Sequence, residues 1–304
     1  MILNALKTRA KINRQIREFF FARDVMEVET SLLCTHTITS PYIDSISAGP
    51  RYLQTSPEYG MKRLLCAGSG SIYQLCKAFR QEESGRHHNP EFTLLEWYRP
   101  GYNHHDLMRE LEDLLKLLLN THSADKKSYR ECFLTFTQID PFTCHLQTLY
   151  DFITHKNLLH DLTHIDHDTA LQVILSEYIE PRINPDIPFF LYDFPATQAS
   201  LAKIRYEDFP LGERFELYYQ GLELANGFHE LADANEQHER FKQEQEKRRH
   251  LNRHVPEIDH YLIDALKEGM PNAAGVAVGL DRIVMIAMKA HSIDEVLAFP
   301  WEQS

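Results

Sequence analysis

The stretch Phe79–Arg99 constrains the fold most, because its charged and aromatic residues alternate with the two-residue period of paired strands. Side chains of a strand point to opposite faces in turn, so Arg80 and Glu82 share one face of the incoming strand. One face of the outgoing strand carries Phe92, Leu94, Glu96 and Tyr98. If the polar loop between the strands closes an antiparallel pair, these groups form a surface for a charged, flat ligand. A hairpin with a merely solvated face is the alternative.

The opposite face of this pair is apolar, which favours a sheet that is anchored on a core. It carries Phe79, Leu95 and Trp97. With 304 residues, 43% of them hydrophobic, the chain can bury a substantial core in one large domain or two smaller ones. Its cysteines include no C-x-x-C pair, so neither a disulfide framework nor a zinc ribbon is expected. They are Cys34, Cys66, Cys76, Cys132 and Cys144.

Charge and hydropathy limit the partners and the location of the protein. The 44 acidic residues outnumber the 32 basic ones and give a formal net charge of -12, which disfavours a broad, sequence-independent contact with a phosphate backbone. No charged segment followed by an apolar run opens the chain, and no run of about 18 apolar residues occurs. We therefore expect a cytoplasmic protein.

Residues 55–58, Thr-Ser-Pro-Glu, predict the start of a helix that runs to about Ala67. Hydroxyl side chains cap helix starts, proline suits the first turn, and an acid is favourable beside the positive end of the helix dipole. These preferences alone explain Glu58. The alternative is that Glu58 binds the ammonium group of a ligand.

The stretch 213–227 predicts two strands joined by a turn near Gly221. Glu216 and Glu223 lie almost symmetrically about that turn, so the hairpin brings them toward each other. Like charges that face each other are destabilising unless a cation lies between them, and Mg²⁺ prefers carboxylate ligands. Strict alternation places Asn226 on the other face from Glu223, so a bulge near Gly227 is needed to bring it round. A surface hairpin with outward-facing acids is the alternative.

The stretch 275–286 predicts a glycine-flanked apolar strand that leads into a buried helix. Arg282 then lies in the first turn of that helix, where a cation is electrostatically unfavourable, so a strong anion nearby would explain it. Gly279 permits close approach of a ligand to the backbone.

Two further patterns have ordinary explanations. His160, His164 and His167 follow the i, i+4, i+7 spacing of one helix face, which could hold a metal, although a solvated face is the commoner arrangement. The charge-rich run 236–254 predicts a solvated helix, with a partner-binding patch as the alternative.

Read together, three segments resemble the signature motifs of class II aminoacyl-tRNA synthetases, most closely the lysyl type. RDVMEVETSLL resembles the first motif, FRQEESGRHHNPEFTLLEWY the second and GVAVGLDRIVM the third. TSPEYGMKRLL, ERFELYYQGLELANGFHEL and EVLAFP are similar to lysyl-type sequence between and beyond them. The resemblance covers nearly the whole chain. It implies an α+β fold, a class II catalytic domain with an antiparallel sheet flanked by helices.

The resemblance also implies roles for individual residues. Arg80 and Arg282 would be catalytic, with Arg80 on the α-phosphate of ATP and on the substrate carboxylate, and Arg282 on the γ-phosphate. The other ATP-binding residues would be Glu82, His88, Asn89, Phe92, Glu223, Leu224 and Gly279. Glu216 and Glu223 would hold Mg²⁺. The substrate-binding residues would be Ser56, Pro57, Glu58, Tyr98, Asn226, Glu230 and Ala277. Among these, Glu58 would take the amino group near the carboxylate, and Tyr98 with Glu230 the distal ammonium.

No anticodon-binding β-barrel precedes the first motif, so the chain is most similar to the freestanding paralogues of lysyl-tRNA synthetase. This implies ATP-dependent activation of (R)-β-lysine as an acyl-adenylate and its transfer to a lysine side chain of translation elongation factor P. We expect one catalytic domain over residues 1–304, with 103–188 as a mostly helical insertion and no anticodon-binding domain. We also expect a homodimer formed through the first motif, and no stable binding to tRNA or membranes. The alternatives are a truncated tRNA-charging enzyme and a non-catalytic, amino-acid-sensing regulatory paralogue.

Two residues depart from the family pattern. Ser31 replaces the usual proline of the first motif, which reduces the rigidity of that strand end. Ala277 replaces a glycine that lysyl-tRNA synthetases share. We hypothesise that its methyl group crowds the α-amino position and favours a β-amino acid, a steric effect of about 1 to 3 kcal/mol.

Overall fold

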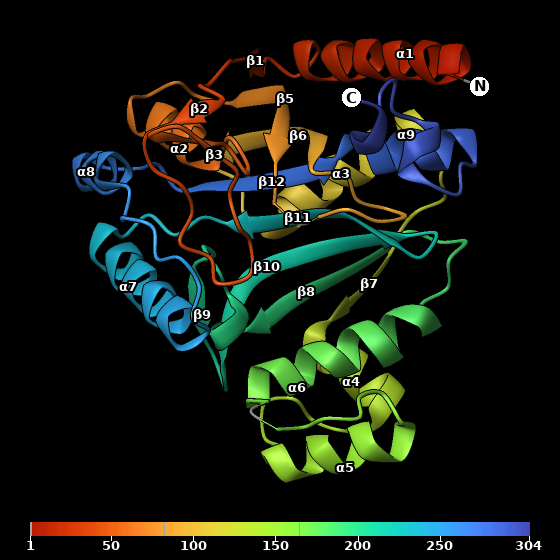
Figure 1. Ribbon diagram of the computed structural model, residues 1–304, viewed down its shortest axis with the longest axis vertical. Coiled ribbons are helices and arrows are strands. Elements are labelled where there is room, and N and C mark those ends of the chain that lie inside the picture. The colour runs from red at the N-terminus through yellow and green to blue at the C-terminus, as the bar shows by residue number, and fades with distance from the viewer. Residues whose placement is uncertain (1, 82, 164) are drawn as a thin grey trace. The chain divides into compact units, whose positions relative to one another are not determined.

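The computed structural model describes residues 2–81, 83–163 and 165–304, so Glu82 and His164 lie outside the described residues. The chain forms two compact units (Figure 1). The first comprises Met1–Asn120 and Glu230–Ser304, and the second comprises Thr121–His229. Among the described residues, no helix is both long and apolar enough to cross a membrane.

The sheet of the first unit contains the strand pair that the alternating sequence predicts. Its strands follow the order β1 (Met26–Glu27), β5 (Ile72–Phe79), β6 (Glu91–Pro100) and β12 (Ala273–Gly279). The β5–β6 and β6–β12 pairs are antiparallel, whereas β1 and β5 run parallel. A small antiparallel sheet joins β2 (Leu33–Cys34), β4 (Arg51–Leu53) and β3 (Ser47–Ala48). The predicted antiparallel sheet is confirmed.

Helices cover the apolar face of β6, as the sequence predicts. They are α1 (Ile2–Phe21), α3 (His104–Leu119) and α9 (Leu280–Met288). Trp97 is fully buried there, its ring 5.3 Å from that of Phe20 on α1, and its indole N–H donates to Glu110 of α3. An Asn103–Asp106 capping box fixes the start of α3.

The remaining helices of the first unit are α2 (Glu58–Cys66), α7 (Ala234–His250) and α8 (His260–Glu268), with short 3₁₀ turns at Ile293–Glu295 and Trp301–Gln303. α8 packs against both α2 and α7. α7 confirms the helix predicted over the charge-rich run. Its Arg248 is nevertheless buried, because its guanidinium donates to the backbone of Ser40 and pairs with Asp44.

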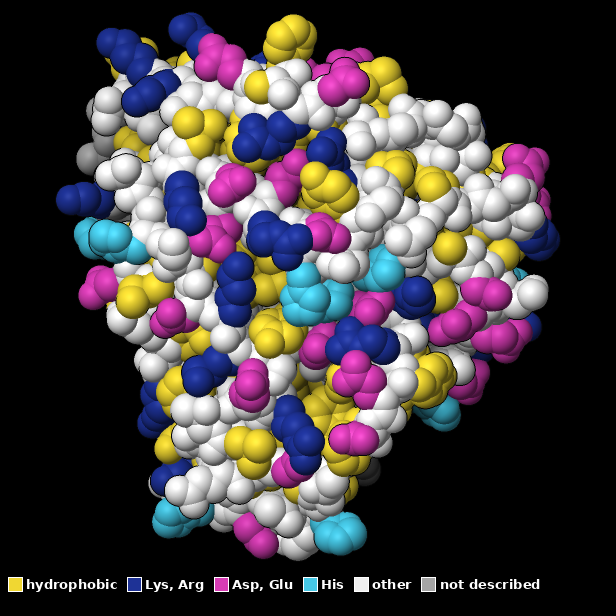
Figure 2. All heavy atoms as spheres, turned by 180° about the vertical axis from the view of Figure 1, so that it is seen from behind, with side chains coloured by type: hydrophobic (Ala, Val, Ile, Leu, Met, Phe, Trp, Pro, Cys, Tyr) yellow, Lys and Arg dark blue, Asp and Glu magenta, His cyan; other side chains and the backbone are white. Residues whose placement is uncertain are grey.

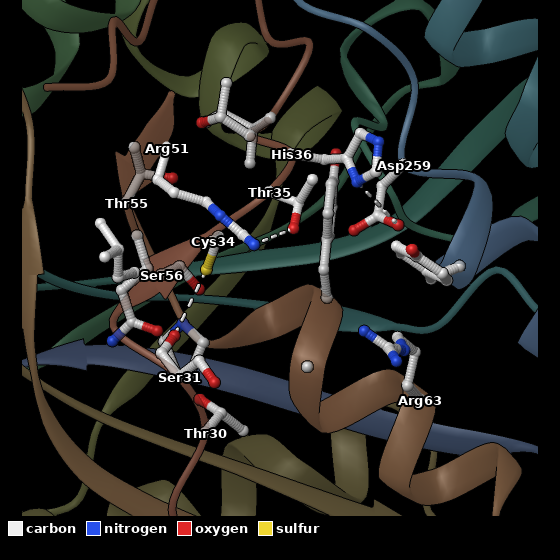
Figure 3. A pocket seen from close by; sticks show the side chains of 18 residues that line it. Thr30, Ser31, Cys34, Thr35, His36, Arg51, Thr55, Ser56, Arg63 and Asp259 are labelled. Atoms are coloured by element: carbon white, nitrogen blue, oxygen red, sulfur yellow. Dashed lines mark hydrogen bonds and ion pairs between the residues drawn. The ribbon is translucent and has the colours of Figure 1, made fainter. Parts of the chain in front are cut away.

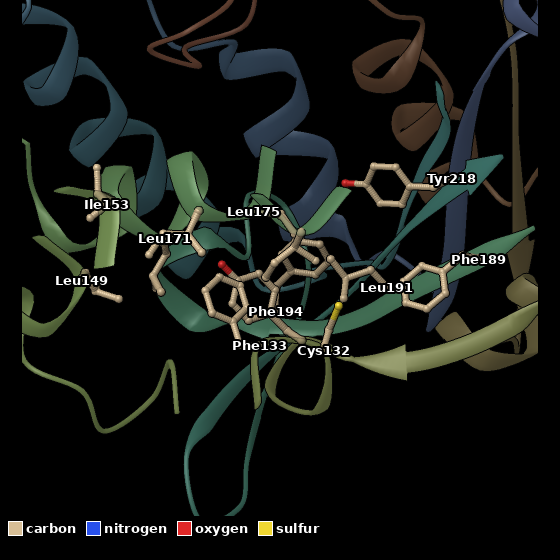
Figure 4. Close-up of a cluster of buried hydrophobic side chains, with 14 residues drawn as sticks. Cys132, Phe133, Leu149, Ile153, Leu171, Leu175, Phe189, Leu191, Phe194 and Tyr218 are labelled. Carbon is tan, nitrogen blue, oxygen red and sulfur yellow. The ribbon is translucent and has the colours of Figure 1, made fainter. Parts of the chain in front are cut away.

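The second unit combines a sheet with a helical layer. The sheet follows the order β11 (Leu222–His229), β10 (Pro210–Tyr219), β8 (Phe189–Pro195) and β7 (Asp125–Ser128), and β9 (Ile204–Tyr206) also pairs with β10. The helices are α4 (Tyr129–Thr137), α5 (Leu146–Lys156) and α6 (His167–Ile174), followed by a π-helical turn at Leu175–Ile179 and 3₁₀ turns at Glu180–Arg182 and Ala196–Gln198. Aromatic and aliphatic side chains from both layers meet in one core (Figure 4), among them Phe133, Leu171 and Phe194.

The predicted histidine face is wrong. α5 ends at Asn157, whose left-handed backbone terminates the helix, and α6 begins only after Asp166, whose side chain caps it. His160 therefore lies in the connecting segment and His167 in the first turn of α6. The His167 ring instead lies 3.2 Å from the Cys144 carbonyl oxygen. His164 lies outside the described residues.

Candidate active site

The face of the sheet that carries Glu96 and Tyr98 is organised in rows, because residues directly opposite each other in antiparallel strands share a face. Glu96 is paired with Gln74 of β5 and with Ala277 of β12. Tyr98 is paired with Gly275 in the next row. Each row lies about 6.8 Å from the next, since a strand rises about 3.4 Å per residue. β6 thus displays Phe92 at one end of the face and Tyr98 at the other.

The end of the face near Phe92 collects cationic side chains. The incoming strand ends at Phe79, so Arg80 lies just beyond the strand and not within it as the sequence predicts, and its N–H is bonded to the Pro90 carbonyl. The Arg80 guanidinium lies 5.1 Å from the centre of the Phe92 ring, a cation–π contact. The Glu83 carboxylate is 3.5 Å from it. This arrangement leaves a cation and an aromatic plate on one surface.

Arg282 stands in the first turn of α9, as the sequence predicts, with Gly279 at the preceding N-cap position. Its guanidinium lies 2.7 Å from Nε2 of His88. Burial and the Arg282 charge lower the pKa of His88 below its ordinary value, so the neutral ring accepts this hydrogen bond. Asn89 is buried, and its side chain donates to the Glu91 carbonyl and accepts from the Trp301 N–H.

A buried carboxylate fixes the start of α9. Asp281 pairs with Arg9 of α1 and accepts a hydrogen bond from the backbone N–H of Thr93 on β6. Arg9 also donates to the Val296 carbonyl. This contact joins α1, β6 and α9 at the residue before Arg282, and so it sets where the Arg282 side chain begins.

The other end of the face is acidic and closed. Glu96 is buried and accepts hydrogen bonds from the Ser56 hydroxyl and from the Tyr98 hydroxyl, each at 2.7 Å. Burial, followed by the Glu58 carboxylate, raises the pKa of Glu96 to about 8. The two hydroxyl donors oppose that rise. A carboxyl group in this state changes its charge readily near neutral pH.

Lys62 lies between two of the predicted substrate-binding acids. Its ammonium is 2.6 Å from Glu58, one turn earlier on α2, and 2.6 Å from Glu230. The Lys62 side chain is only 2% exposed and that of Glu230 is 0% exposed. Burial alone would lower the pKa of Lys62, but the Glu230 and Glu58 carboxylates outweigh it and raise the pKa. The protein thus supplies one of the positive charges that these acids require.

The predicted helix start is confirmed with one correction. α2 begins at Glu58, so Pro57 occupies the N-cap position rather than the first turn. The Ser56 hydroxyl accepts a hydrogen bond from the Glu58 N–H and donates to Glu96. Ser56 therefore connects the helix start with the row of the sheet that contains Gln74, Glu96 and Ala277, which we call the acid row.

Gly275 leaves room for two substrate-binding candidates. A Cβ atom at this position would lie 2.3 Å from the Tyr98 ring and 2.6 Å from a Glu230 oxygen, so any side chain would displace both. Ala277 lies two residues further along β12, opposite Glu96. Its methyl group is therefore on the acidic face and in the acid row.

A cavity of about 240 Å³ adjoins the segment that carries Ser56 and Pro57 (Figure 3). Its wall is rich in hydroxyl groups and also includes Cys34, Arg51 and Arg63. His36 lies 3.8 Å from Asp259 across it, and the Cys34 thiol donates to the Ser31 carbonyl. The lining does not include Glu58, Glu96 and Glu230, the three acids that we call the acid cluster. The cavity therefore borders the acid cluster without containing it.

The β10–β11 hairpin of the second unit confirms the predicted strands and corrects their register. Its turn contains Gly221, with φ of 73°, a conformation that favours glycine. Glu216 pairs with Asn226, whereas Glu223 pairs with Tyr218. Leu224 is the additional residue of a bulge at this point. The bulge therefore lies at Leu224 rather than near Gly227.

Because of that bulge, Glu216, Glu223 and Asn226 share one face of the hairpin. Glu216 is buried and pairs with Arg214, and it also accepts a hydrogen bond from Tyr218. Glu223 is exposed. Burial and the Glu216 carboxylate raise the pKa of nearby Glu180 to about 7, which marks this region as strongly negative. Leu224 itself is buried.

The family model described as tRNA synthetases class II (D, K and N) matches residues 1–303. The chain belongs to this family. The predicted class II synthetase fold is therefore confirmed.

Similar class II synthetase-like proteins are named elongation factor P–(R)-β-lysine ligase. One from Vibrio atlanticus is 46% identical, and the match covers 99% of this chain and 97% of that protein. Those from Yersinia enterocolitica and Photorhabdus laumondii are each 49% identical, with 98% of this chain and 95% of each relative covered. These relatives are named as ligases and as acting on elongation factor P.

The residues that the resemblance predicts account for most of the cluster, but two of its members, Glu96 and Lys62, are not among them. Glu96 is noticeable in the sequence only as a charged residue on the alternating face, and its bonds to Ser56 and Tyr98 reveal its position. Lys62 follows Glu58 by one helical turn, a spacing that predicts a surface ion pair. Its second partner, Glu230, is far away in sequence, so the sequence gives no signal for that contact.

Proposed function

We propose that the chain activates (R)-β-lysine with ATP as an acyl-adenylate and transfers it to a lysine side chain of elongation factor P. The observation that supports this most is the acid cluster Glu58, Glu96 and Glu230 at one end of β6, with Arg80 and Phe92 at the other. The names of the relatives support the same substrates. We further propose that residues 1–304 act as one catalytic module.

Charge complementarity explains the preference for a lysine-like substrate. Three carboxylates and the Lys62 ammonium leave the cluster with an excess of negative charge when Glu96 is ionised. A diamine supplies two positive charges to it. The row of Tyr98 and Gly275, beside Glu230, binds the distal ammonium, while Glu58 and Ser56 lie toward the other amino group. Asn226 orients the carboxylate end.

The proposed reaction has two steps, and neither requires a side-chain nucleophile. A substrate carboxylate oxygen attacks the α-phosphorus of ATP, and pyrophosphate leaves. The neutral amine of the acceptor lysine then attacks the acyl carbon, and AMP leaves. Catalysis is positioning together with electrostatic stabilisation of the phosphates by Arg80 and Arg282, while Phe92 stacks on adenine and His88 and Asn89 border the nucleotide. The assignment of Glu82 to adenine remains a proposal on a residue outside the described ranges.

The oxygen ligands of the β10–β11 hairpin suit Mg²⁺, which favours carboxylates together with substrate phosphates. Glu216 and Glu223 share a face with the amide of Asn226, and Glu223 is exposed. When bound, the ion neutralises charge that develops on the phosphates. Arg214 already pairs with Glu216, so the hairpin offers the metal one buried, oriented carboxylate and one exposed carboxylate.

We also propose a homodimer formed through the first motif. Large apolar side chains are exposed in and beside this segment, which is unusual for a surface that faces only water. They are Phe21, Met26, Leu32 and Leu33. Light scattering should give the mass of two chains, and Leu33→Glu should shift it toward one. A monomeric wild-type protein would contradict the proposal, in which Ser31 loosens rather than abolishes the contact.

Labelled (R)-β-lysine tests the function directly. Mixed with ATP and the enzyme, the label should move to elongation factor P and not to tRNA, with Arg80→Ala as the inactive control. Labelling of tRNA would favour a truncated tRNA-charging enzyme. Absence of ATP–pyrophosphate exchange with every lysine isomer would favour a regulatory sensor.

Ala277→Gly tests the origin of the β-amino preference. Because Ala277 faces the acid row, removal of its methyl group should improve exchange with α-lysine relative to β-lysine by about tenfold, within the 1 to 3 kcal/mol range of a steric change of this size. Exchange assays with both isomers measure the ratio. An unchanged preference for β-lysine over α-lysine would rule out the steric explanation.

A further inference from the structure

Gln74 lies in the acid row but has no role in the proposed function so far. It pairs with Glu96 in the β5–β6 register, and Glu96 pairs in turn with Ala277. The three side chains therefore leave the sheet on the same face. Ser56 reaches this face through its bond to Glu96, so Gln74 lies beneath the segment that begins α2.

The amide of Gln74 is buried, and its carbonyl end is unused. The residue is only 2% exposed. Within the described parts of the chain, its Oε1 atom has no hydrogen-bond partner. Burial raises the pKa of the Cys76 thiol to about 12, and a hydrogen bond from Gln74 opposes this, which places the amide N–H toward Cys76. Buried polar atoms nearly always have partners, so an unused buried acceptor points to a donor that the chain does not supply.

The surroundings define the chemistry of that donor. Glu96 is directly opposite, so an anionic ligand group would be repelled and an ammonium attracted. A carboxylate at position 74 would face Glu96 as a like charge, whereas an amide adds an acceptor without adding charge. The row lies one step of about 6.8 Å from the row of Tyr98, toward Phe92. That step is comparable with the separation of the two ammonium groups of a lysine-like chain.

We propose that Oε1 of Gln74 accepts a hydrogen bond from the substrate amino group nearer the carboxylate, and that Gln74 thereby selects ligands that carry an amino group at this position over those that lack it. The proposal rests on the proposed function and adds a specificity-determining residue to it. Together with Ala277 in the same row, Gln74 favours an amino group at one position along the substrate chain. The distal ammonium is bound in the neighbouring row and is independent of Gln74.

A double-mutant-type thermodynamic cycle tests the proposed hydrogen bond, by removing the amide from the protein, the amino group from the ligand, or both. Binding of (R)-β-lysine, 6-aminohexanoic acid and 3-aminohexanoic acid is measured by calorimetry on wild type and on Gln74→Met. 6-Aminohexanoic acid lacks the amino group near the carboxylate, and 3-aminohexanoic acid lacks the distal one. Gln74→Met should weaken (R)-β-lysine and 3-aminohexanoic acid by about tenfold or more, as for a hydrogen bond to a charged group, and leave 6-aminohexanoic acid unchanged. Lys77→Met is the matched control, because the Lys77 side chain leaves β5 on the opposite face and is 44% exposed.

Equal weakening of all three ligands, or of none, would overturn the inference and leave Gln74 as a structural residue that holds water. If Gln74→Met does not fold, Gln74→Glu provides the test. This variant keeps the acceptor and adds a negative charge, so it should increase the preference for (R)-β-lysine over 6-aminohexanoic acid. A smaller preference would overturn the inference. A wild type that binds (R)-β-lysine without exchanging pyrophosphate would contradict the function alone, and one that binds no lysine-like amine would contradict both.

Discussion

The two ends of β6 handle charge in opposite ways. At the Tyr98 end, Lys62 is 2% exposed and held between Glu58 and Glu230. At the Phe92 end, the Arg80 side chain is 27% exposed, and the Glu83 carboxylate is 3.5 Å away. A buried, closely paired cation is part of the fold, whereas an open, loosely paired one is available to a ligand.

Under the proposed function, this difference would explain how one strand serves two substrates. The closed end would bind the amino acid, and its fixed negative charges would distinguish ligands by the positions of their amines. The open end would bind the nucleotide, and its cations would have to be accessible to phosphates whose charge changes during the reaction. We therefore expect substitutions at the closed end to affect stability first, and substitutions at the open end to affect rate alone. Figure 2 shows basic and acidic side chains interspersed on the displayed face, so this face carries no broad field of one sign.

The largest effect is expected for Lys62→Met. It leaves the buried Glu230 carboxylate and the half-buried Glu58 carboxylate without their shared cation, which should reduce the free energy of unfolding by about 3 to 5 kcal/mol. Urea unfolding measures this. In Lys77→Met, which removes an exposed pair with Glu91, the loss should stay below about 1 kcal/mol. Equal losses of unfolding free energy in the two variants would contradict the distinction between a buried, closely paired cation and an exposed one.

Arg80→Ala is expected to affect rate and not stability. Loss of the cation beside Phe92 should slow adenylation by about 10²-fold or more, because stabilisation of developing phosphate charge is lost. ATP–pyrophosphate exchange gives the rate, and a thermal melt gives the stability. A near-normal rate would show that Arg80 does not act in the site. A large fall in melting temperature would show that Arg80, like Lys62, mainly stabilises the fold.

Glu223→Gln extends the comparison to the hairpin of the second unit. Arg214 pairs with Glu216 there, while Glu223 is exposed. Like the Phe92 end of β6, the hairpin therefore has an accessible charge, and we expect it to bind Mg²⁺ from solution. The Mg²⁺ concentration for half-maximal exchange should rise about tenfold or more. Glu177→Gln, another exposed acid of the same unit, is the control. An unchanged requirement would exclude Glu223 as a ligand.

The smallest effect concerns pH. Glu96 has a pKa of about 8 and faces Glu58, Glu230, Tyr98 and Ser56, and its ionised form attracts an ammonium. Protonation weakens binding, so affinity for (R)-β-lysine should rise about tenfold between pH 6.5 and pH 8 and level off above the pKa. For stability the sign is opposite, because the folded state binds the proton more tightly: the contribution is present below about pH 4.5 and is lost as pH rises through 8. Glu96→Gln should flatten both profiles, and a binding profile unchanged in the variant would exclude Glu96 as the titrating group.

Local patterns in the sequence predict the elements of the site better than its contacts. The alternation of Phe92, Glu96 and Tyr98 predicts their shared face, because the period of a strand is fixed by backbone geometry. The motif around Arg282 likewise predicts a strand that leads into a helix. By contrast, the Lys62–Glu230 pair joins residues distant in sequence, and no local pattern encodes it.

Small changes of register explain the errors. The bulge at Leu224 is determined by which side chain the core accepts, so alternation alone locates it wrongly. The histidine spacing suggests a continuous helix, but Asn157 and Asp166 supply a stop and a start between the residues concerned. In both cases one residue shifts the face of all those that follow.

The Asp281 contact has a mechanical consequence. Arg9 on the first helix, Thr93 on the central strand and Asp281 beside the nucleotide cation are joined at one carboxylate. If a neighbouring chain packs on the first motif and Arg282 binds phosphate, as we propose, a displacement of α1 would reach the residue before Arg282 through this one carboxylate. Assembly and nucleotide affinity would then be coupled through a contact that lies outside the substrate site.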